Sequence, residues 1–131
     1  MREFTPPSLE VENIAKEIVD AAFRVHKSLG PGLMESVYEV CMTHELAGRG
    51  LSVETQLDIP IHYDDILIKA GFRLDMLVEK EVIVELKAVE EMHPVFHSQI
   101  MTYLKLMNKR LGFLINFNVP LIKDGIKRII L

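Results

Sequence analysis

The chain has 131 residues, a single cysteine and a formal net charge of −4, with 49% hydrophobic and 26% charged residues. This size fits one compact folding unit, and the composition excludes long disorder and an internal disulfide. The apolar runs are too short to cross a bilayer and the N-terminus has no signal core, so we expect a cytoplasmic protein without a membrane partner. We expect one domain over residues 1–131, with residues 1–8 as a loose tail.

Charge is distributed unevenly along the chain. Residues 1–86 hold 8 Lys and Arg against 16 Asp and Glu, and residues 87–131 hold 7 against 3, which gives −8 and +4. The overall negative charge argues against a polyanionic partner. The basic excess could still form a phosphate-facing side or a solvated surface, and both readings stay open. The basic residues concerned are Lys105, Lys109, Arg110, Lys123, Lys127 and Arg128.

Two helices are predicted first. After Ser8, a suitable N-cap, apolar residues recur at helical spacing as far as Leu29, where Gly30-Pro31-Gly32 ends the helix. A second helix is predicted from Leu33 to about Ala47. Its apolar set is expected to face the core, with Glu35 and Tyr38 on the other side. That set is Leu33, Val37, Val40, Cys41 and His44.

The period changes to two after Leu51, which indicates strands. A strand is predicted from there to a turn at Asp64-Asp65, and further strands at about 66–78, 82–88, 111–117 and 126–131, with a helix at about 95–108. This order predicts an α/β fold: two N-terminal helices, a strand meander, one helix and returning strands in a central mixed sheet flanked by helices. The apolar last strand must be covered by its own fold or by a partner such as a second copy in a homodimer.

The stretch VIVELKAV, residues 82–89, places Glu85 and Lys87 within an apolar strand. Because apolar faces must match, a three-residue loop at 79–81 fixes the register of the hairpin. Asp75 then stands across from Glu85 and Arg73 across from Lys87, with opposed Cβ atoms roughly 4.5–5.5 Å apart. The apolar pairs in this register are Val78 with Val82, Met76 with Val84 and Leu74 with Leu86.

Two opposed carboxylates destabilise a sheet unless positive charge lies beside them. Lys87 points to the same side as Glu85, and Mg²⁺ would fit because it binds one or two protein carboxylates together with waters and phosphate oxygens. These residues therefore predict a phosphodiesterase site. The alternative is a surface network of ion pairs made by Arg73, Asp75, Glu85 and Lys87, with each pair worth roughly 0.2–1 kcal/mol.

The same residues resemble a known signature. Asp75, nine residues and then Glu85-Leu86-Lys87 resembles the core of the PD-(D/E)XK nuclease superfamily, with Leu74 at the nominal Pro position. The segment from Gly32 to Tyr38, GLMESVY, is similar to the motif of the GxxExxY branch. Two later segments resemble the Q…YLK helix and the G-L-L-I-N-F strand of that branch: QIMTYLK at 99–105 and GFLINF at 112–117. The resemblance covers about residues 10–131.

This resemblance implies a restriction-endonuclease-like fold and a nuclease that requires Mg²⁺ or Mn²⁺ and acts on nucleic acid, on DNA in preference to RNA. By the motif, Asp75 and Glu85 would bind the metal with the Leu86 carbonyl, and Glu35 would complete or orient the metal shell. Lys87 would orient an attacking water and stabilise negative charge as it develops. The resemblance gives supporting roles to Gln99, Tyr103 and Tyr38, although Tyr38 could equally be a core residue.

Two observations leave alternatives open. Where the family often shows a His-Glu pair, this chain has Phe96-His97, and the superfamily includes members that bind without cutting. A non-catalytic nucleic-acid or protein binding module is therefore the alternative to a nuclease. His93 and His97 are four residues apart, as in a zinc helix, but Pro94 at the first helical position would leave His93 outside the helix.

Overall fold

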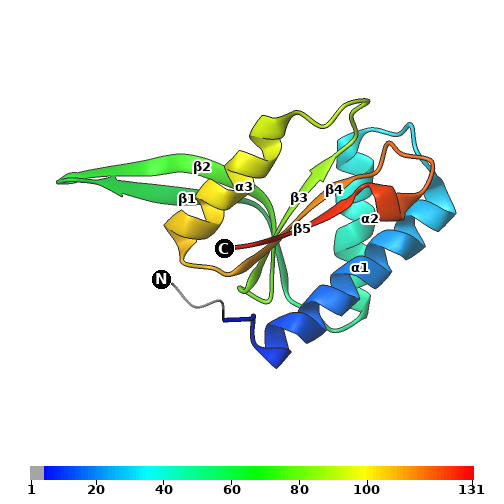
Figure 1. The fold of residues 1–131 in the computed structure, drawn as a ribbon, viewed down its shortest axis with the longest axis horizontal. Helices are drawn as coiled ribbons and strands as arrows, with labels where there is room; N and C mark the ends of the chain where they lie inside the picture. The colour runs from blue at the N-terminus through cyan, green and yellow to red at the C-terminus, as the bar shows by residue number, and fades with distance from the viewer. Residues whose placement is uncertain (1–4) are drawn as a thin grey trace.

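The structure is a computed structural model that describes residues 5–131. Three helices and a five-stranded sheet form three layers, with α1 and α2 on one face of the sheet and α3 on the other (Figure 1). Of the expected N-terminal tail, residues 1–4 lie outside the described residues, and residues 5–8 form neither helix nor strand. In chain order the elements are α1 Leu9–Leu29, α2 Glu35–Gly48, β1 Val53–Tyr63, β2 Ile66–Val78, β3 Val82–Lys87, α3 Pro94–Met107, β4 Leu111–Asn116, η1 Ile122–Asp124 and β5 Ile126–Ile130.

The strand order in the sheet is β1-β2-β3-β4-β5, the same as the order in the chain. Within residues 5–131, β3 and β4 are parallel, with α3 as the crossover between them, and the other neighbouring strands are antiparallel. The predicted α/β class and mixed sheet are therefore confirmed. Ile129 of the last strand is only 3% exposed and packs within the chain's own core, so this strand does not require a partner to cover it. A homodimer stays a prediction.

Helix α1 begins and ends where the sequence predicts. The Val11 amide donates to the Ser8 hydroxyl at 3.2 Å, and Gly30 follows the helix with φ 70°, a conformation that glycine adopts without steric cost. The predicted apolar face is buried except at its end, where Leu29 is 38% exposed. Its buried members are Val11, Ile14, Ile18, Ala22 and Val25.

Helix α2 packs the opposite way from the prediction. It begins at Glu35 rather than Leu33, and it buries Tyr38, Met42 and Leu46 while Val40 is 69% exposed. Val37 and Leu33 are also exposed, Cys41 is half-buried and His44 is exposed. The helix has apolar residues on both sides, so its periodicity does not decide the inward face. The side of α2 that faces the core is the side that carries Tyr38, whose ring stacks on Phe117 with the centroids 4.4 Å apart.

Two apolar clusters pack on the two faces of the sheet. The side chains of β2 do not alternate regularly between these faces. Leu74 and Leu77 join the cluster under α3, whereas Met76 joins the cluster under α1 and α2. The predicted pairing of Leu74 with Leu86 is therefore wrong. The strand alternation breaks at Asp75, opposite Gln56, whose φ of 49° is the left-handed conformation that interrupts the pairing of β1 with β2.

The outer parts of β1 and β2 extend beyond the helices as a two-stranded arm (Figure 1). The pairing shifts register around Pro60, and the Ile61 side chain occupies the space where Gly71 has no side chain. A Cβ on Gly71 would lie 2.3 Å from Ile61 Cγ1. The exposed apolar residues of the arm are Tyr63, Ile66, Leu67 and Ile68.

Candidate metal-dependent active site

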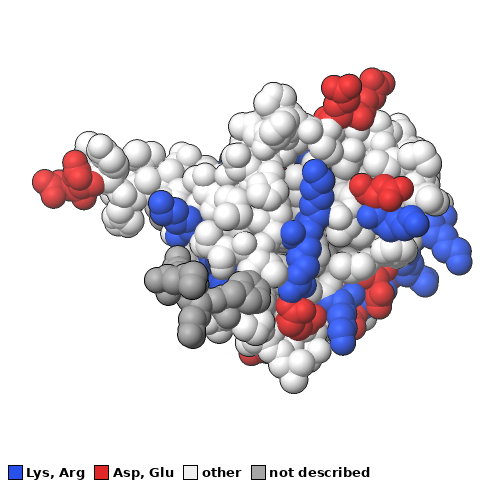
Figure 2. Space-filling view, in the orientation of Figure 1, with Lys and Arg blue, Asp and Glu red and all other residues white. Residues whose placement is uncertain are grey.

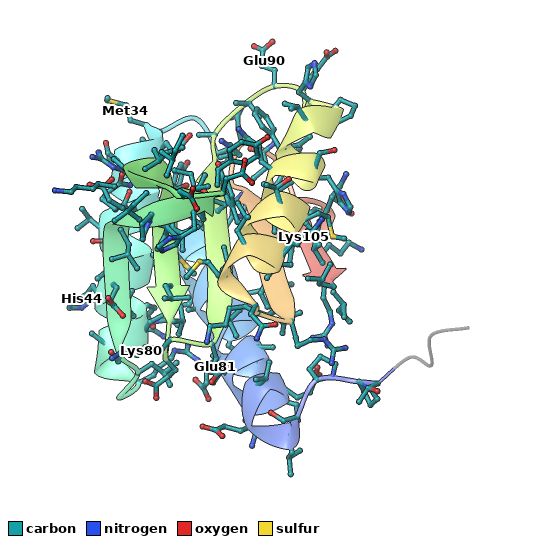
Figure 3. All side chains as sticks on the ribbon, turned by 90° about the vertical axis from the view of Figure 1, so that its left-hand side faces the viewer. Met34, His44, Lys80, Glu81, Glu90 and Lys105 are labelled. Atoms are coloured by element: carbon teal, nitrogen blue, oxygen red, sulfur yellow. The ribbon has the colours of Figure 1, made fainter. Side chains whose placement is uncertain are left out.

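The β2–β3 hairpin opens at the end away from its turn. The predicted register holds at the turn, with Val78 opposite Val82 and Met76 opposite Val84, and the pairing stops there. Lys80 and Glu81 mark the turn, and Glu90 lies at the far end of the sheet, beyond the opening (Figure 3). At the opening, side chains take over the contacts between the strands.

Asp75 and Glu85 make these contacts. The Asp75 amide donates to Glu85 Oε1 at 3.3 Å, and the Leu86 amide donates to Asp75 Oδ2 at 2.9 Å. The two carboxyl groups therefore lie side by side, as the register predicts. Arg73 does not lie across from Lys87, because its Nε donates to Asp58 Oδ1 of β1 at 2.9 Å. The structure therefore does not form the alternative network of these four charges, and the break in β2 at Asp75 explains why.

Glu85 is the buried member of the pair, with 7% of its surface exposed. Burial is the main cause that raises the pKa of Glu85 to about 9, and a side-chain hydrogen bond with Asp75 and the charge of Asp75 add to it. The Asp75 amide and Lys87 act in the opposite direction. At neutral pH, with Lys87 as the nearby positive charge, the Glu85 carboxyl therefore keeps its proton unless a metal ion binds beside it.

The Leu86 carbonyl points toward the same opening. The Phe117 amide donates to the Lys87 carbonyl at 2.9 Å, so the main-chain polar groups of Lys87 face β4. Successive residues of a strand direct these groups to alternate edges, so those of Leu86 face β2. The hydrogen bond from the Leu86 amide to Asp75 agrees with this direction. A third hard oxygen thus lies at the edge of β3 next to the two carboxyls.

Glu35 lies in the electrostatic field of this site as the first residue of α2. Partial desolvation and then the charge of Asp75 raise the pKa of Glu35, whereas Lys87 lowers it. Gln56 links the helix to the sheet, because its Nε2 donates to Glu39 Oε2 at 3.0 Å and lies 3.5 Å from Asp75 Oδ1. Gln56 and Glu39 were not predicted as site residues, and no signal in the sequence distinguishes them from other exposed polar residues.

Helix α3 places side chains beside Lys87 and beside β2. Lys87 Nζ lies 4.3 Å from the centroid of the Phe96 ring. Tyr103 stacks on Phe72 with the centroids 4.5 Å apart, and burial, followed by the charges of Glu85 and Asp75, raises the pKa of Tyr103. Gln99 is exposed on the same helix. Tyr103 thus packs on Phe72 of β2 and is affected by the charges of the carboxyl pair, and the roles of Tyr103 and Gln99 stay predictions.

Comparison with known proteins agrees with this geometry. The family model of the PD-(D/E)XK nuclease superfamily matches residues 12–129. The chain belongs to the PD-(D/E)XK nuclease superfamily. No curated protein and no solved structure gives a significant match. Membership confirms the superfamily and the fold that the motifs predict, while assignment to the GxxExxY branch stays a prediction.

Nucleases of the PD-(D/E)XK superfamily generally use divalent metal ions, and the donors at this opening fit such an ion. Asp75 and Glu85 supply hard carboxylate oxygens, which suit Mg²⁺ because it needs only one or two protein carboxylates. Within residues 5–131, no three Asp, Glu, His or Cys side chains gather as a full ligand set, so Glu35 is a neighbour rather than a third donor in this geometry. His93 is the N-cap of α3, with its Nδ1 accepting from the Val95 amide at 3.1 Å, which gives the zinc alternative no support.

Two arginines of the basic excess that follows β3 make contacts within the chain. Arg110 donates to the Leu131 and Thr5 carbonyls, and Arg128 pairs with Glu12. Lys and Arg side chains gather over β5 and α1, with acidic side chains among them, while the surface over α3 is largely uncharged (Figure 2). None of the helices in residues 5–131 combines the length and apolar character needed to span a bilayer.

Tyr38, the last residue of the GxxExxY-like motif, acts on the loop before Glu35. Its hydroxyl donates to the Gly30 carbonyl at 2.6 Å and accepts from the Leu33 amide at 3.1 Å, and the side chain is fully buried. We expect Tyr38→Phe to lower the free energy of unfolding by about 1–3 kcal/mol, because the two loop groups lose their partner. Thermal melts with Tyr63→Phe, an exposed tyrosine, as the control would check this; equal melting temperatures for the two variants would contradict it.

Proposed function

We propose that this protein is a nuclease that requires Mg²⁺ or Mn²⁺ and hydrolyses phosphodiester bonds, in DNA in preference to RNA. The observation that carries the proposal is the buried Glu85 carboxyl beside Asp75 at the open end of the hairpin, with Lys87 two residues further along on the same face of β3. Burying the Glu85 carboxyl beside a second carboxyl of like charge is costly, so stability alone is a poor reason to keep the pair. Membership of a nuclease superfamily supports the same reading.

Each residue would have a distinct task. Asp75, held by the Leu86 amide, and Glu85 would hold the divalent cation together with the Leu86 carbonyl. When bound, the cation supplies Lewis-acid charge that neutralises the reacting phosphate. The Lys87 ammonium would orient the attacking water and stabilise the negative charge that develops on phosphorus oxygens.

The reaction needs positioning more than covalent chemistry. A bond forms between the water oxygen and phosphorus as the opposite ester bond breaks. The water gives up one proton and the leaving oxygen gains one, so the products are a phosphomonoester and an alcohol. Glu35 and Tyr103 lie in the field of the carboxyl pair and would shape its charge rather than react. Gln99, on the exposed surface of α3, would contact a phosphate of the substrate.

The direct test is cleavage of end-labelled single-stranded DNA, duplex DNA, branched DNA and RNA with Mg²⁺ or Mn²⁺. We expect cleavage that EDTA abolishes, with a DNA substrate cut faster than RNA. If the protein binds one of these nucleic acids and cuts none with either metal, it is a binding module that keeps the nuclease fold. Faster cleavage of RNA would overturn the substrate assignment alone.

A further inference from the structure

We propose that Phe96 is a positioning residue that holds the Lys87 ammonium beside the carboxyl pair and out of a salt bridge with it. This inference rests on the proposed function and adds to it a residue that the sequence motifs do not mark. The Lys87 Nζ atom lies 4.3 Å from the Phe96 ring centroid, within the range of a cation–π contact.

The charges around Lys87 make this placement informative. Lys87 follows Glu85 by two residues in β3, so the two side chains project from the same face of the strand, and the ammonium lowers the pKa of both Glu35 and Glu85. Yet none of the ion pairs found among residues 5–131 within 4.0 Å involves Lys87. The side chain lies over an aromatic face although carboxyl groups are near.

Both partners of this contact are fixed by their backbones. Lys87 is paired with Asn116 in the parallel ladder, and its carbonyl accepts from the Phe117 amide at 2.9 Å. Phe96 lies in the first turn of α3, where Pro94 and the His93 cap set the start of the helix, and its ring packs on the cluster under α3. The ring therefore offers a fixed face to a side chain that otherwise has four rotatable bonds.

The consequence concerns the free charges of the site. A salt bridge from Lys87 would occupy carboxylate oxygens that a divalent cation needs and would tie up the N–H donors. Attraction to a ring face forms no hydrogen bond with a carboxylate, so N–H groups of the ammonium can still donate to a phosphate or to a water. An aliphatic side chain at position 96 would fill the space without this attraction.

The first test compares Phe96→Leu with Phe96→Tyr in the cleavage assay. We expect Phe96→Leu to lower kcat by about 3- to 30-fold with KM and Mn²⁺ affinity unchanged, and Phe96→Tyr to restore kcat to within about two-fold of wild type. Phe23→Leu on the exposed side of α1 makes the same chemical change away from the site and should leave kcat unchanged. Wild-type kcat in Phe96→Leu would overturn the inference.

A double-mutant cycle separates positioning from general loss of packing. In a Lys87→Ala background, Phe96→Leu should have no further effect on the residual rate, because the group that it positions is gone. A full additional loss in that background would show that Phe96 acts through something other than Lys87, and the inference would fall.

A spectroscopic measurement decides the contact without any activity. The Lys87 ε-methylene protons should be shifted upfield by the Phe96 ring in NMR spectra of the wild-type protein and return toward ordinary lysine values in Phe96→Leu. Ordinary values in wild type would overturn the inference even if no variant could be purified. If wild type shows the shift but cuts none of the nucleic acids, the proposed function fails and the contact between the two residues stands.

Discussion

Glu85→Ala and Lys87→Ala should each reduce cleavage by about 10²- to 10⁴-fold, the range found when one electrostatic or acid–base group is removed from an active site. The two variants should lose activity for different reasons. Glu85→Ala removes one of two carboxylates at the metal position, so Mn²⁺ binding should be lost in isothermal titration. Lys87→Ala keeps both carboxylates, so it should still bind Mn²⁺ while its kcat falls.

The hairpin carries its own matched controls. Lys80 and Glu81 are the same residue types in the turn at the other end of β2 and β3 (Figure 3). Lys80→Ala and Glu81→Ala should bind Mn²⁺ and cut at the wild-type rate. Cleavage at wild-type rates by Glu85→Ala, with Mn²⁺ binding retained, would show that the carboxyl pair is structural and that the proposed site is wrong.

The metal-free protein should become less stable as the pH rises from about 5 to about 9. In the folded protein the pKa of Glu85 is raised to about 9, above the ordinary value of 4.5, so between these values the folded state binds more protons than the unfolded state. This group's contribution is fully present below about pH 4.5 and is lost as the pH rises through the folded pKa. A single group changes the free energy of unfolding by at most about 1.4 kcal/mol per pH unit.

Glu85→Gln is the variant that tests this dependence. The amide cannot ionise, so at pH 8.5 in EDTA the variant should melt roughly 5–10 °C above wild type, and the two curves should converge near pH 5. Glu81→Gln in the turn should follow wild type across the range. Added Mn²⁺ should raise the melting temperature of wild type and not of Glu85→Gln, since binding to the folded state alone stabilises it. Parallel curves for wild type and Glu85→Gln would contradict the burial argument.

The hairpin that holds the site could be predicted from the sequence because its register depends on residues that are close together in the chain. A three-residue loop and two alternating apolar strands leave one register, and that register places Asp75 beside Glu85. Helix α1 was predictable for a similar reason, since a single apolar face follows a good cap. The site residues themselves came from the motif resemblance, and their catalytic roles stay predictions.

The remaining errors come from contacts between distant segments. Helix α2 has apolar residues on both sides, and only the packing of Tyr38 on Phe117 selects the buried one. The alternation of side chains in β2 breaks at Asp75, opposite Gln56 of β1, which has a left-handed conformation. A polar residue in an alternating strand pattern gives no sign of such a conformation, so the break could not be predicted. In the sequence, Phe96 stands where the family often has a polar residue of a His-Glu pair, so it was not predicted to have a role. Its contact with Lys87 forms because α3 packs on the sheet.

Because β3 pairs with β4 in parallel, we expect the parts of the site to form at different times during folding. The β2–β3 hairpin closes over residues 79–81, so Asp75 and Glu85 come together after a small loss of chain entropy. Pairing β3 with β4 requires the whole crossover through α3, which is slower because the contacts are distant in sequence. During folding, Asp75 and Glu85 should therefore come together before Phe96 contacts Lys87. A divalent cation present at that stage would find the carboxyl pair formed and Lys87 not yet positioned.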